Sequence, residues 1–370
     1  MTGLHAKGVK LRILMPLSDA YGGFGGIAQY NRDVLRTLSD VPQVDQIVAV
    51  PRLISESLGD IPAKVIFDAA AAQGKLAFIV RLLRHGLFAP RADLIWCAHI
   101  NLLPLCALIA RLRKVPLVLM IYGLEVWQDA PGPLTRWALR QVTRLASISR
   151  FTADRFAEIA PIAGLPLDIL PNAVDLSLYG MAPKSADLMA RFNLSDRRII
   201  LTLARMPENA TKGFDAMLEA MPRVIKAVPD ALYVIGGRGE DAERLRQKAD
   251  TLGIGDHVIF AGEIAEGRKA DFYRLADLFA MPSSGDGFGF VFIEALACGI
   301  PVLSSTVDGG YEAIMHGGMG RGVDPGDINA LAQQLIEGLD DAKHIPERLN
   351  HYALPQFAAR LRKVVDAAVA

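Results

Sequence analysis

The segment from Ser283 to Pro301, SSGDGFGFVFIEALACGIP, says more about the fold than any other part of the sequence. It holds two carboxylates, Asp286 and Glu294, with a Gly-Phe-Gly turn between them and the second carboxylate on a predicted helix. A glycine-rich turn that opens into a helix presents free backbone N–H groups and the positive end of the helix dipole, which favour a phosphate. Flanking carboxylates suit the hydroxyls of a sugar or a ribose. We therefore predict that this segment binds a nucleotide-sugar.

The composition predicts a globular protein with two domains. At 370 residues the chain exceeds one ordinary domain, and 51% hydrophobic against 22% charged residues supports a substantial core. Lysine and arginine total 40, as do aspartate and glutamate, so the chain has no global basic field. We therefore expect no nucleic-acid partner.

The cysteines and the N-terminus indicate a cytoplasmic protein. Cys97, Cys106 and Cys298 lie in apolar segments without metal-ligand spacing, which is typical of buried thiols in a reducing compartment. The N-terminus lacks the apolar core of a signal peptide. The most membrane-like region, Leu102–Tyr122, is interrupted by the cations of 111–114 and falls short of the roughly 20 apolar residues of a spanning helix. We expect any contact with the inner membrane to be peripheral.

Short apolar runs repeat along the chain in two similar halves. In the first half these runs are Leu11–Met15, Ile47–Val50, Val65–Phe67, Leu94–Cys97, Leu117–Ile121 and Leu145–Ile148. In the second half they are Ile199–Ala204, Leu232–Ile235, Val258–Phe260, Leu278–Met281 and Val302–Ser304. Apolar runs without alternation, separated by helix-like segments, indicate parallel sheets covered on both faces. We predict two Rossmann-like, doubly wound α/β domains facing each other across a cleft, with the ligand at the carboxyl ends of the strands.

The connection between the domains is predicted in the segment Leu170–Tyr179. The expected limits are 1–175 for the N-terminal domain and 176–350 for the C-terminal domain. The apolar positions of Phe357–Val369 predict a last helix. We expect this helix, within 351–370, to pack back towards the N-terminal domain.

Glu294 lies in an otherwise apolar helix, Phe290–Cys298, where a carboxylate is costly unless it has a partner or lines a cleft. We therefore favour a functional role over that of an exposed glutamate on a surface helix. The whole segment resembles the donor-binding signature of family 4 of the retaining, GT-B-fold glycosyltransferases, which has Glu, Gly-Phe-Gly, a second Glu and then Cys-Gly-x-Pro. Other segments resemble further family motifs in the same order: Leu170–Asp175, Ala204–Pro207 with Lys212–Phe214, Leu275–Ser283 and Gly309–Ala313.

The resemblance implies transfer of a hexose, with retention of its anomeric configuration, from a UDP- or GDP-linked donor to a glycan or lipid-linked acceptor. It places the nucleotide-sugar on the C-terminal domain and the acceptor on the N-terminal domain, in synthesis of bacterial envelope lipopolysaccharide or exopolysaccharide. In the front-face mechanism usually proposed for the family, a donor phosphate oxygen accepts the acceptor proton. Two alternatives stay open: a nucleotide-sugar 2-epimerase with the same GT-B fold, and a non-catalytic nucleotide-sugar-binding subunit.

Arg205 and Lys212 occupy the positions with which the family holds the donor diphosphate. Their spacing alone fits two solvated cations around a loop. Two positioned cations in a cleft can stabilise a leaving diphosphate without a metal. Because the chain has no Asp-x-Asp pair, we expect neither a metal nor another cofactor.

The resemblance assigns the remaining donor contacts to the signature and to one strand end. Glu294 would hold the ribose hydroxyls and Asp286 the donor sugar. The family usually has Glu at the position of Asp286, so the reach here is one methylene shorter. Backbone N–H groups of the turn would contact the sugar and phosphate, at Gly287, Phe288, Gly289 and Phe290. Gly262 and Glu263 would border the base pocket.

Strand ends in the N-terminal half supply candidates for the acceptor side. Gly25 and Gly26 follow the first strand and would allow close backbone approach of the donor phosphate or of the acceptor, although a merely tight connection fits as well. His99 follows another strand, and a structural histidine is the alternative there. Tyr122 stands where many family members have histidine, so no catalytic histidine is assigned at that position. Glu125 is a further candidate for contact with the acceptor.

The segment Lys75–His85 combines an apolar stripe with cationic flanks. This pattern fits a surface helix whose apolar face is covered by the rest of the protein. It also fits an interfacial helix on an anionic lipid surface, which would suit a lipid-linked acceptor.

Overall fold

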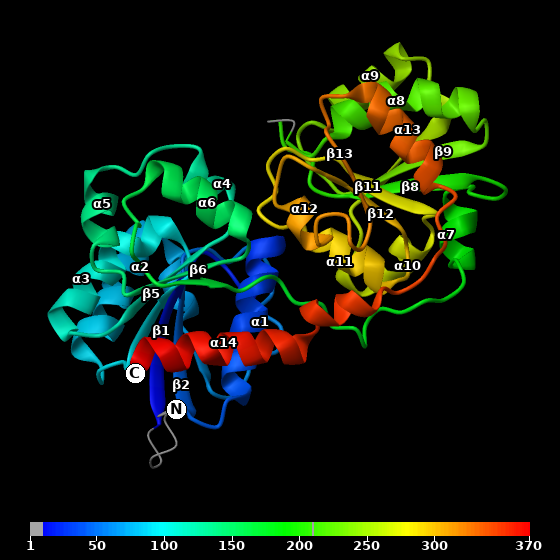
Figure 1. The fold of residues 1–370 in the computed structure, drawn as a ribbon. Coiled ribbons are helices and arrows are strands. Elements are labelled where there is room, and N and C mark those ends of the chain that lie inside the picture. Colours follow the sequence, from blue (N-terminus) through cyan, green and yellow to red (C-terminus); the bar gives the residue numbers. More distant parts are fainter. Residues whose placement is uncertain (1–9, 209–210) are drawn as a thin grey trace. The chain divides into compact units, whose positions relative to one another are not determined.

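The computed structural model describes residues 10–208 and 211–370. The chain forms two compact units, each with its own sheet (Figure 1). The first unit contains the chain up to Ala173 together with Pro355–Ala370, and the second unit is Val174–Leu354. The limits expected from the sequence, 175 and 350, lie within a few residues of these divisions.

The first unit is built on a parallel sheet of seven strands, in the order β3-β2-β1-β4-β5-β6-β7. Its strands are β1 (Leu11–Leu17), β2 (Val44–Pro51), β3 (Val65–Phe67), β4 (Leu94–Cys97), β5 (Leu117–Ile121), β6 (Arg144–Ser147) and β7 (Leu167–Ile169). The runs predicted in this half are confirmed as the first six strands. The order turns back between β1 and β4, and ligands bind outside the carboxyl ends of strands at such a point.

Helices lie on both sides of this sheet, with α2, α3 and α5 on one side and α1 and α14 on the other (Figure 1). The helical segments are α1 (Gly26–Asp40), η1 (Ala69–Gln73), α2 (Lys75–Leu83), η2 (Arg84–Phe88), η3 (Ile100–Leu102), α3 (Leu103–Arg113), α4 (Leu124–Trp127), α5 (Pro133–Leu139), α6 (Arg150–Ile159) and α14 (Leu354–Val369). The last helix, α14, therefore packs in the first unit. Its Phe357 meets Tyr30 of α1 edge-on, with ring centroids 5.7 Å apart.

The second unit has a parallel sheet of six strands, in the order β10-β9-β8-β11-β12-β13. Its strands are β8 (Arg198–Leu203), β9 (Ala231–Gly236), β10 (Val258–Gly262), β11 (Leu278–Met281), β12 (Val302–Ser305) and β13 (Arg321–Val323). Its helical segments are α7 (Ala186–Arg191), α8 (Phe214–Ala227), α9 (Ala242–Thr251), η4 (Gly255–His257), η5 (Glu266–Arg268), α10 (Lys269–Arg274), α11 (Phe290–Ala297), α12 (Gly310–Ala313), α13 (Ile328–Gly338) and η6 (Glu347–Tyr352). The order turns back between β8 and β11.

Both units fold around strands that are buried on both faces. In β8 the whole run Ile199–Leu203 is buried, and burial of each such Val, Leu or Ile side chain contributes about 1.5–3 kcal/mol. Helix α8 is amphipathic and buries one face. In α8 the predicted positions Met217, Leu218 and Met221 are buried in the core of the second unit. The predicted architecture of two Rossmann-like domains is thus confirmed.

The three cysteines are buried, free thiols, as the sequence predicts. Among the helices of the described residues, none is both long and apolar enough to cross a membrane. Within 10–208 and 211–370, no group of His, Cys, Asp and Glu is placed to hold a metal ion.

Candidate active site

The segment Ser283–Pro301 forms a loop at the carboxyl end of β11 and then α11, as predicted. Because β11 lies beside β8, this loop is at the point where the strand order turns back. Gly289 ends the loop with φ 81°, a left-handed backbone that favours glycine. The helix α11 begins at the next residue, Phe290. The local sequence therefore directs the chain from the loop straight into the helix.

The turn at Lys212 lies directly against this loop. A Cβ on Gly213 would lie 2.2 Å from the carbonyl oxygen of Pro282, so only glycine fits there. The N–H of Ser284 donates to the carbonyl oxygen of Thr211 at 2.9 Å. These two backbone contacts bring Lys212 beside the loop that carries the first carboxylate.

Lys212 and Asp286 form an ion pair. The ammonium group of Lys212 donates to Oδ1 of Asp286, and the two side chains are only 21% and 13% exposed. The other oxygen, Oδ2 of Asp286, is buried and has no hydrogen-bond partner among the residues that the structure describes. A buried acceptor without a donor is costly, and a hydroxyl of a ligand would satisfy it.

The turn after β12 also packs on the loop. A Cβ on Gly309 would lie 2.1 Å from the carbonyl oxygen of Gly287, and its N–H donates to the carbonyl oxygen of Asp286 at 2.8 Å. The ring of Phe288 is buried edge-on against Tyr352, with centroids 5.2 Å apart. Phe288 can therefore face a ligand only through its backbone. The donor contacts expected of the loop backbone, from 287 to 290, stay predictions.

Arg205 is exposed just beyond the carboxyl end of β8, the strand next to β11. The glycine-rich loop after β9 lies against this segment. A Cβ on Gly237 would lie 1.9 Å from the carbonyl oxygen of Ala204, and one on Gly239 would lie 2.0 Å from that of Met206. The family motifs predict no role for this loop, although its Gly-Gly-Arg-Gly run directly after a strand is a recognisable sequence pattern.

Gly262 and Glu263, the expected border of the base pocket, adjoin the same glycine-rich loop. The N–H of Gly237 donates to the carbonyl oxygen of Gly262 at 2.8 Å. Glu263 pairs with Arg238 at 3.0 Å, and both side chains are exposed. The structure thus places five of the predicted residues at the carboxyl ends of the strands of one sheet. They are Arg205, Lys212, Asp286, Gly262 and Glu263.

Glu294 is buried within the second unit, with 1% of its surface exposed. The hydroxyl of Tyr179 donates to its Oε1 at 2.7 Å, and that of Tyr273 donates to its Oε2 at 2.6 Å. The ammonium of Lys269 lies 3.7 Å from Oε1. Burial raises the pKa of Glu294, and the charge of Lys269 and the two hydroxyls oppose that rise. This carboxylate therefore has protein partners, and its expected contact with ribose stays a prediction.

The partners of Glu294 are missing from the sequence analysis. Lys269 and Tyr273 are four positions apart, so they lie on the same face of α10. Their spacing in the sequence indicates that they can act as partners of Glu294, because a buried carboxylate needs a cation and hydroxyl donors. Tyr179 comes from the segment that enters the second unit, and no local pattern relates it to α11.

In the first unit, polar residues gather beyond the carboxyl ends of β4 and β5. The hydroxyl of Tyr122 donates to Asn31 at 2.9 Å, and the N–H of Tyr122 donates to the carboxylate of Glu125 at 2.6 Å. Nδ1 of His99 accepts from the N–H of Asn101 at 3.1 Å, which leaves Nε2 for another partner. Burial lowers the pKa of His99, while the charges of Glu125 and Asp19 oppose that shift.

Gly25 and Gly26, which we predict to allow close approach of a ligand to the backbone, lie at the start of α1. Gly25 has φ 94°, which favours glycine, and α1 begins at Gly26. A Cβ on either residue would meet no atom within 4 Å. A side chain at either position would therefore meet no obstruction, and the role of this turn in binding a ligand stays a prediction.

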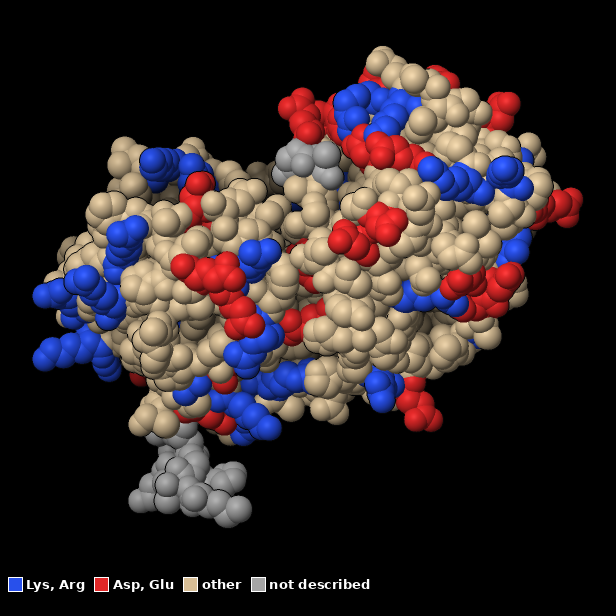
Figure 2. Space-filling model, turned by 45° about the horizontal axis from the view of Figure 1, so that its top comes forward, with Lys and Arg blue, Asp and Glu red and all other residues tan. Residues whose placement is uncertain are grey.

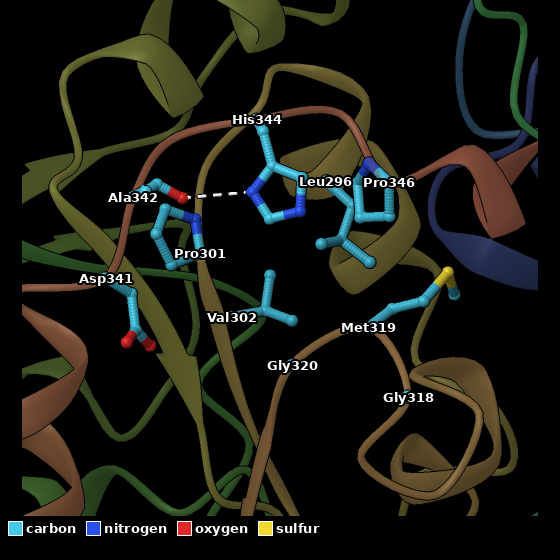
Figure 3. A pocket seen from close by; sticks show the side chains of 10 residues that line it. All are labelled: Leu296, Pro301, Val302, Gly318, Met319, Gly320, Asp341, Ala342, His344 and Pro346. Atoms are coloured by element: carbon cyan, nitrogen blue, oxygen red, sulfur yellow. Dashed lines mark hydrogen bonds between the residues drawn. The ribbon is translucent and has the colours of Figure 1, made fainter.

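A cavity of about 290 Å³ lies at the amino ends of the strands of the second sheet (Figure 3). It is lined by residues from the amino ends of β12 and β13, including Pro301, Val302 and Gly320, and by His344. The loop that carries Asp286 is at the carboxyl ends of the strands. This cavity is therefore separate from the candidate active site.

Models of two protein families match the chain. One is described as Glycosyltransferase Family 4 and covers residues 24–178, and the other is described as Glycosyl transferases group 1 and covers 186–354. Together they span both units.

Relatives and solved structures agree with these matches. A GDP-mannose-dependent alpha-(1-6)-phosphatidylinositol monomannoside mannosyltransferase of Mycobacterium tuberculosis is 33% identical over 264 residues, 67% of each chain. The same-named enzyme of Mycolicibacterium smegmatis is 32% identical, over 62% of this chain and 63% of the relative. The structure of Anabaena HepE in complex with UDP and glucose has a TM-score of 0.75 at 19% identity, covering 96% of this chain and 100% of the other. The chain therefore belongs to glycosyltransferase family 4 and is a retaining glycosyltransferase with the GT-B fold.

Proposed function

We propose that this enzyme transfers mannose from GDP-mannose to a lipid-linked acceptor in the synthesis of an envelope glycolipid. The named relatives that use GDP-mannose support the donor and the class of acceptor. The observation that carries the proposal is the Lys212–Asp286 pair, whose second carboxylate oxygen is buried without a partner among the described residues. That oxygen suits a sugar hydroxyl, and the ammonium beside it suits a diphosphate.

In the proposed reaction, the bond between the anomeric carbon and the diphosphate breaks while a bond to the acceptor oxygen forms on the same face. The acceptor proton passes to an oxygen of the leaving diphosphate. Arg205 and Lys212 stabilise the negative charge that develops there, so the reaction requires no metal or cofactor. Asp286 orients the sugar by accepting a hydroxyl hydrogen bond.

The acceptor is assigned to the first unit, where Nε2 of His99 and the glycine turn at 25–26 are available for contact. An acceptor carried by a lipid requires the enzyme to reach a membrane surface from the cytoplasm. We propose that it does so through the basic apolar face, defined as the exposed side chains of α2, η2 and α3 together with those of Arg91 and Lys114, which follow η2 and α3.

The basic apolar face is continuous and carries cations among apolar side chains. A Cβ on Gly86 of η2 would lie 2.6 Å from Ile109 of α3, so these two segments pack directly on each other. The exposed apolar side chains are Leu76, Val80, Phe88, Leu108 and Leu112. The exposed cations are Lys75, Arg84, Arg91, Arg111 and Lys114.

Acidic residues are almost absent from this part of the chain, because Asp93 is the only one between Asp68 and Glu125. Figure 2 shows Lys and Arg side chains gathered at the outer edge of the first unit, where α3 lies in Figure 1. Exposed apolar side chains among cations suit the surface of a bilayer with anionic lipids.

The donor is tested by thermal shift with GDP, UDP, GDP-mannose and UDP-glucose, in buffer with a chelator. We expect GDP and GDP-mannose to raise the melting temperature. Transfer is then measured with labelled GDP-mannose and a membrane lipid extract, and Asp286→Ala should transfer mannose much more slowly than the wild type. A rise with uridine nucleotides alone would reject GDP-mannose, and consumption of donor without acceptor would indicate epimerisation or hydrolysis.

Membrane contact is tested by co-sedimentation with vesicles of phosphatidylglycerol and of phosphatidylcholine. We expect binding to the anionic vesicles, reduced in the double variant Phe88→Ser, Leu112→Ser. The matched control is Leu178→Ser, which changes an exposed leucine of the second unit. Equal sedimentation of the double variant and the wild type would contradict the proposed face.

A further inference from the structure

One buried carboxylate near the candidate active site has no role in the reaction as proposed. Asp308 follows β12, directly before the glycine turn that leads into α12, and is 3% exposed. Its Oδ2 accepts from the hydroxyl of Ser283 at 2.6 Å and from the N–H of Asp286 at 3.0 Å. Its Oδ1 accepts from the N–H of Gly310 at 2.9 Å. A single side chain thus joins the start and the middle of the loop to the start of α12.

These bonds fix the backbone of Asp286 at both of its polar groups. The N–H of Asp286 donates to Asp308, and its carbonyl oxygen accepts from the N–H of Gly309. Because the two peptide groups that flank its Cα are held, the direction of the Asp286 side chain is set as well. That side chain is the one that pairs with Lys212.

The three hydrogen bonds favour a carboxylate over an amide at position 308. All three partners are donors, and an ionised carboxylate offers only acceptors. An asparagine of the same size would replace one oxygen with an NH₂ group and turn that group against an N–H or O–H donor. Keeping a buried charge in this place is costly, since burial and the charge of Asp286 raise the pKa of Asp308 to about 7.

We propose that Asp308 is a positioning residue for sugar transfer, which holds the Ser283–Gly287 loop so that the Asp286 carboxylate meets both Lys212 and the donor sugar. The inference rests on the proposed donor site in one respect, namely that Asp286 contacts the sugar. It assigns to Asp308 no contact with the substrate.

The proposal predicts a specific pattern of kinetic loss. Asp308→Asn should lower kcat/KM for sugar transfer by about 100-fold, the scale expected when a reacting group is misplaced. The affinity for GDP should change by less than about 3-fold, because the nucleotide has contacts that are independent of Asp286. A variant that only destabilises the fold would lose both kcat/KM for transfer and affinity for GDP. Asp327→Asn is the structural control, since Asp327 accepts from the N–H of Ala330 at the start of α13 and has no bond to the loop.

The deciding experiment is a double-mutant cycle with Asp308→Asn and Asp286→Ala, in which kcat/KM is measured for each variant. If Asp308 acts through Asp286, adding Asp308→Asn to Asp286→Ala should cost less than about 3-fold. Additive losses, or a folded Asp308→Asn variant with wild-type kcat/KM, would overturn the proposal. If the wild type rejects GDP-mannose, the proposed donor is wrong, and the same cycle is measured with the nucleotide-sugar that the wild type does use.

Discussion

The ammonium of Lys212 lies at the carboxyl edge of the second sheet, paired with Asp286. Lys212→Ala removes a cation from the position where the charge of the leaving diphosphate develops. We expect kcat/KM to fall by about 10²–10³, by analogy with the loss of one oxyanion-hole donor. Steady-state kinetics would measure this, with Lys226→Ala as the control because Lys226 is exposed in the last turn of α8. An unchanged kcat/KM for Lys212→Ala would mean that other groups hold the diphosphate.

A substitution at Glu294 tests whether this buried carboxylate binds the ribose in addition to its partners within the protein. Glu294→Gln places an NH₂ group against a tyrosine hydroxyl and removes one of the two charge partners of Lys269, so we expect the free energy of unfolding to fall by about 1–3 kcal/mol. If the carboxylate also holds ribose, the affinity for GDP should fall. Tyr273→Phe is the control, because it removes one hydrogen bond and keeps the carboxylate. Equal GDP affinity in the wild type and Glu294→Gln, by calorimetry, would contradict the ribose contact.

Asp308 predicts a dependence of stability on pH. Burial and the charge of Asp286 raise its pKa from 3.8 to about 7, so the folded protein binds this proton more tightly than the unfolded chain. The group therefore stabilises the fold below its ordinary pKa, and this contribution is lost as the pH rises through 7. In denaturant titrations, the unfolding free energy of the wild type relative to Asp308→Ala should fall by at most about 3 kcal/mol between about pH 5 and pH 8. A difference that stays constant over this range would show that Asp308 does not titrate there.

Among the secondary-structure elements, α14 carries the clearest prediction. It is the last helix of the chain, yet its buried residues Phe357, Leu361, Val364 and Val365 pack in the first unit. Each fully buried side chain of this kind contributes about 1.5–3 kcal/mol. Deleting 355–370 should therefore unfold the first unit or lower its melting temperature sharply. Circular dichroism during heating would measure this, and deletion of Ala370 alone is the control. A truncated chain that melts like the wild type would contradict the prediction.

The elements that the sequence predicts are those with an apolar run of their own. β1 and β8 are examples, because their residues are buried on both faces and so are almost all apolar. β7 and β13 are absent from the sequence analysis. Each has three residues and lies at an edge of its sheet, where partial exposure permits polar residues such as Asp168 and Arg321.

The same reasoning explains how much of the candidate site is accessible from the sequence. The resemblance to family motifs identifies Lys212 and Asp286 although they are 74 positions apart, and the structure pairs them. No motif relates Tyr179 to Glu294, which are 115 positions apart. Asp308 is also missed, because its role depends on three hydrogen bonds that only the folded chain creates.

At the scale of the whole molecule, the second unit is one continuous piece of chain, Val174–Leu354, with its own core. The expected donor contacts of Arg205, Lys212, Asp286 and Glu294 lie in it. We predict that a fragment of residues 174–354 folds alone and binds the same nucleotide as the full chain, with an affinity within about tenfold if the first unit adds no more than about 1.4 kcal/mol. Calorimetry with GDP and UDP would measure this. A folded fragment that binds neither, beside a full chain that does, would place part of the nucleotide site on the first unit.

The chain enters and leaves the second unit at neighbouring points. The N–H of Val174 donates to the carbonyl oxygen of Tyr352 at 2.8 Å, and Val174 forms an isolated parallel bridge with Ala353. In genetic terms, the second unit is an insertion in the first unit, and its two boundaries lie next to each other. Recombination at these two boundaries would exchange the whole second unit, together with any sugar preference it has, and would leave every strand of the first unit's sheet intact.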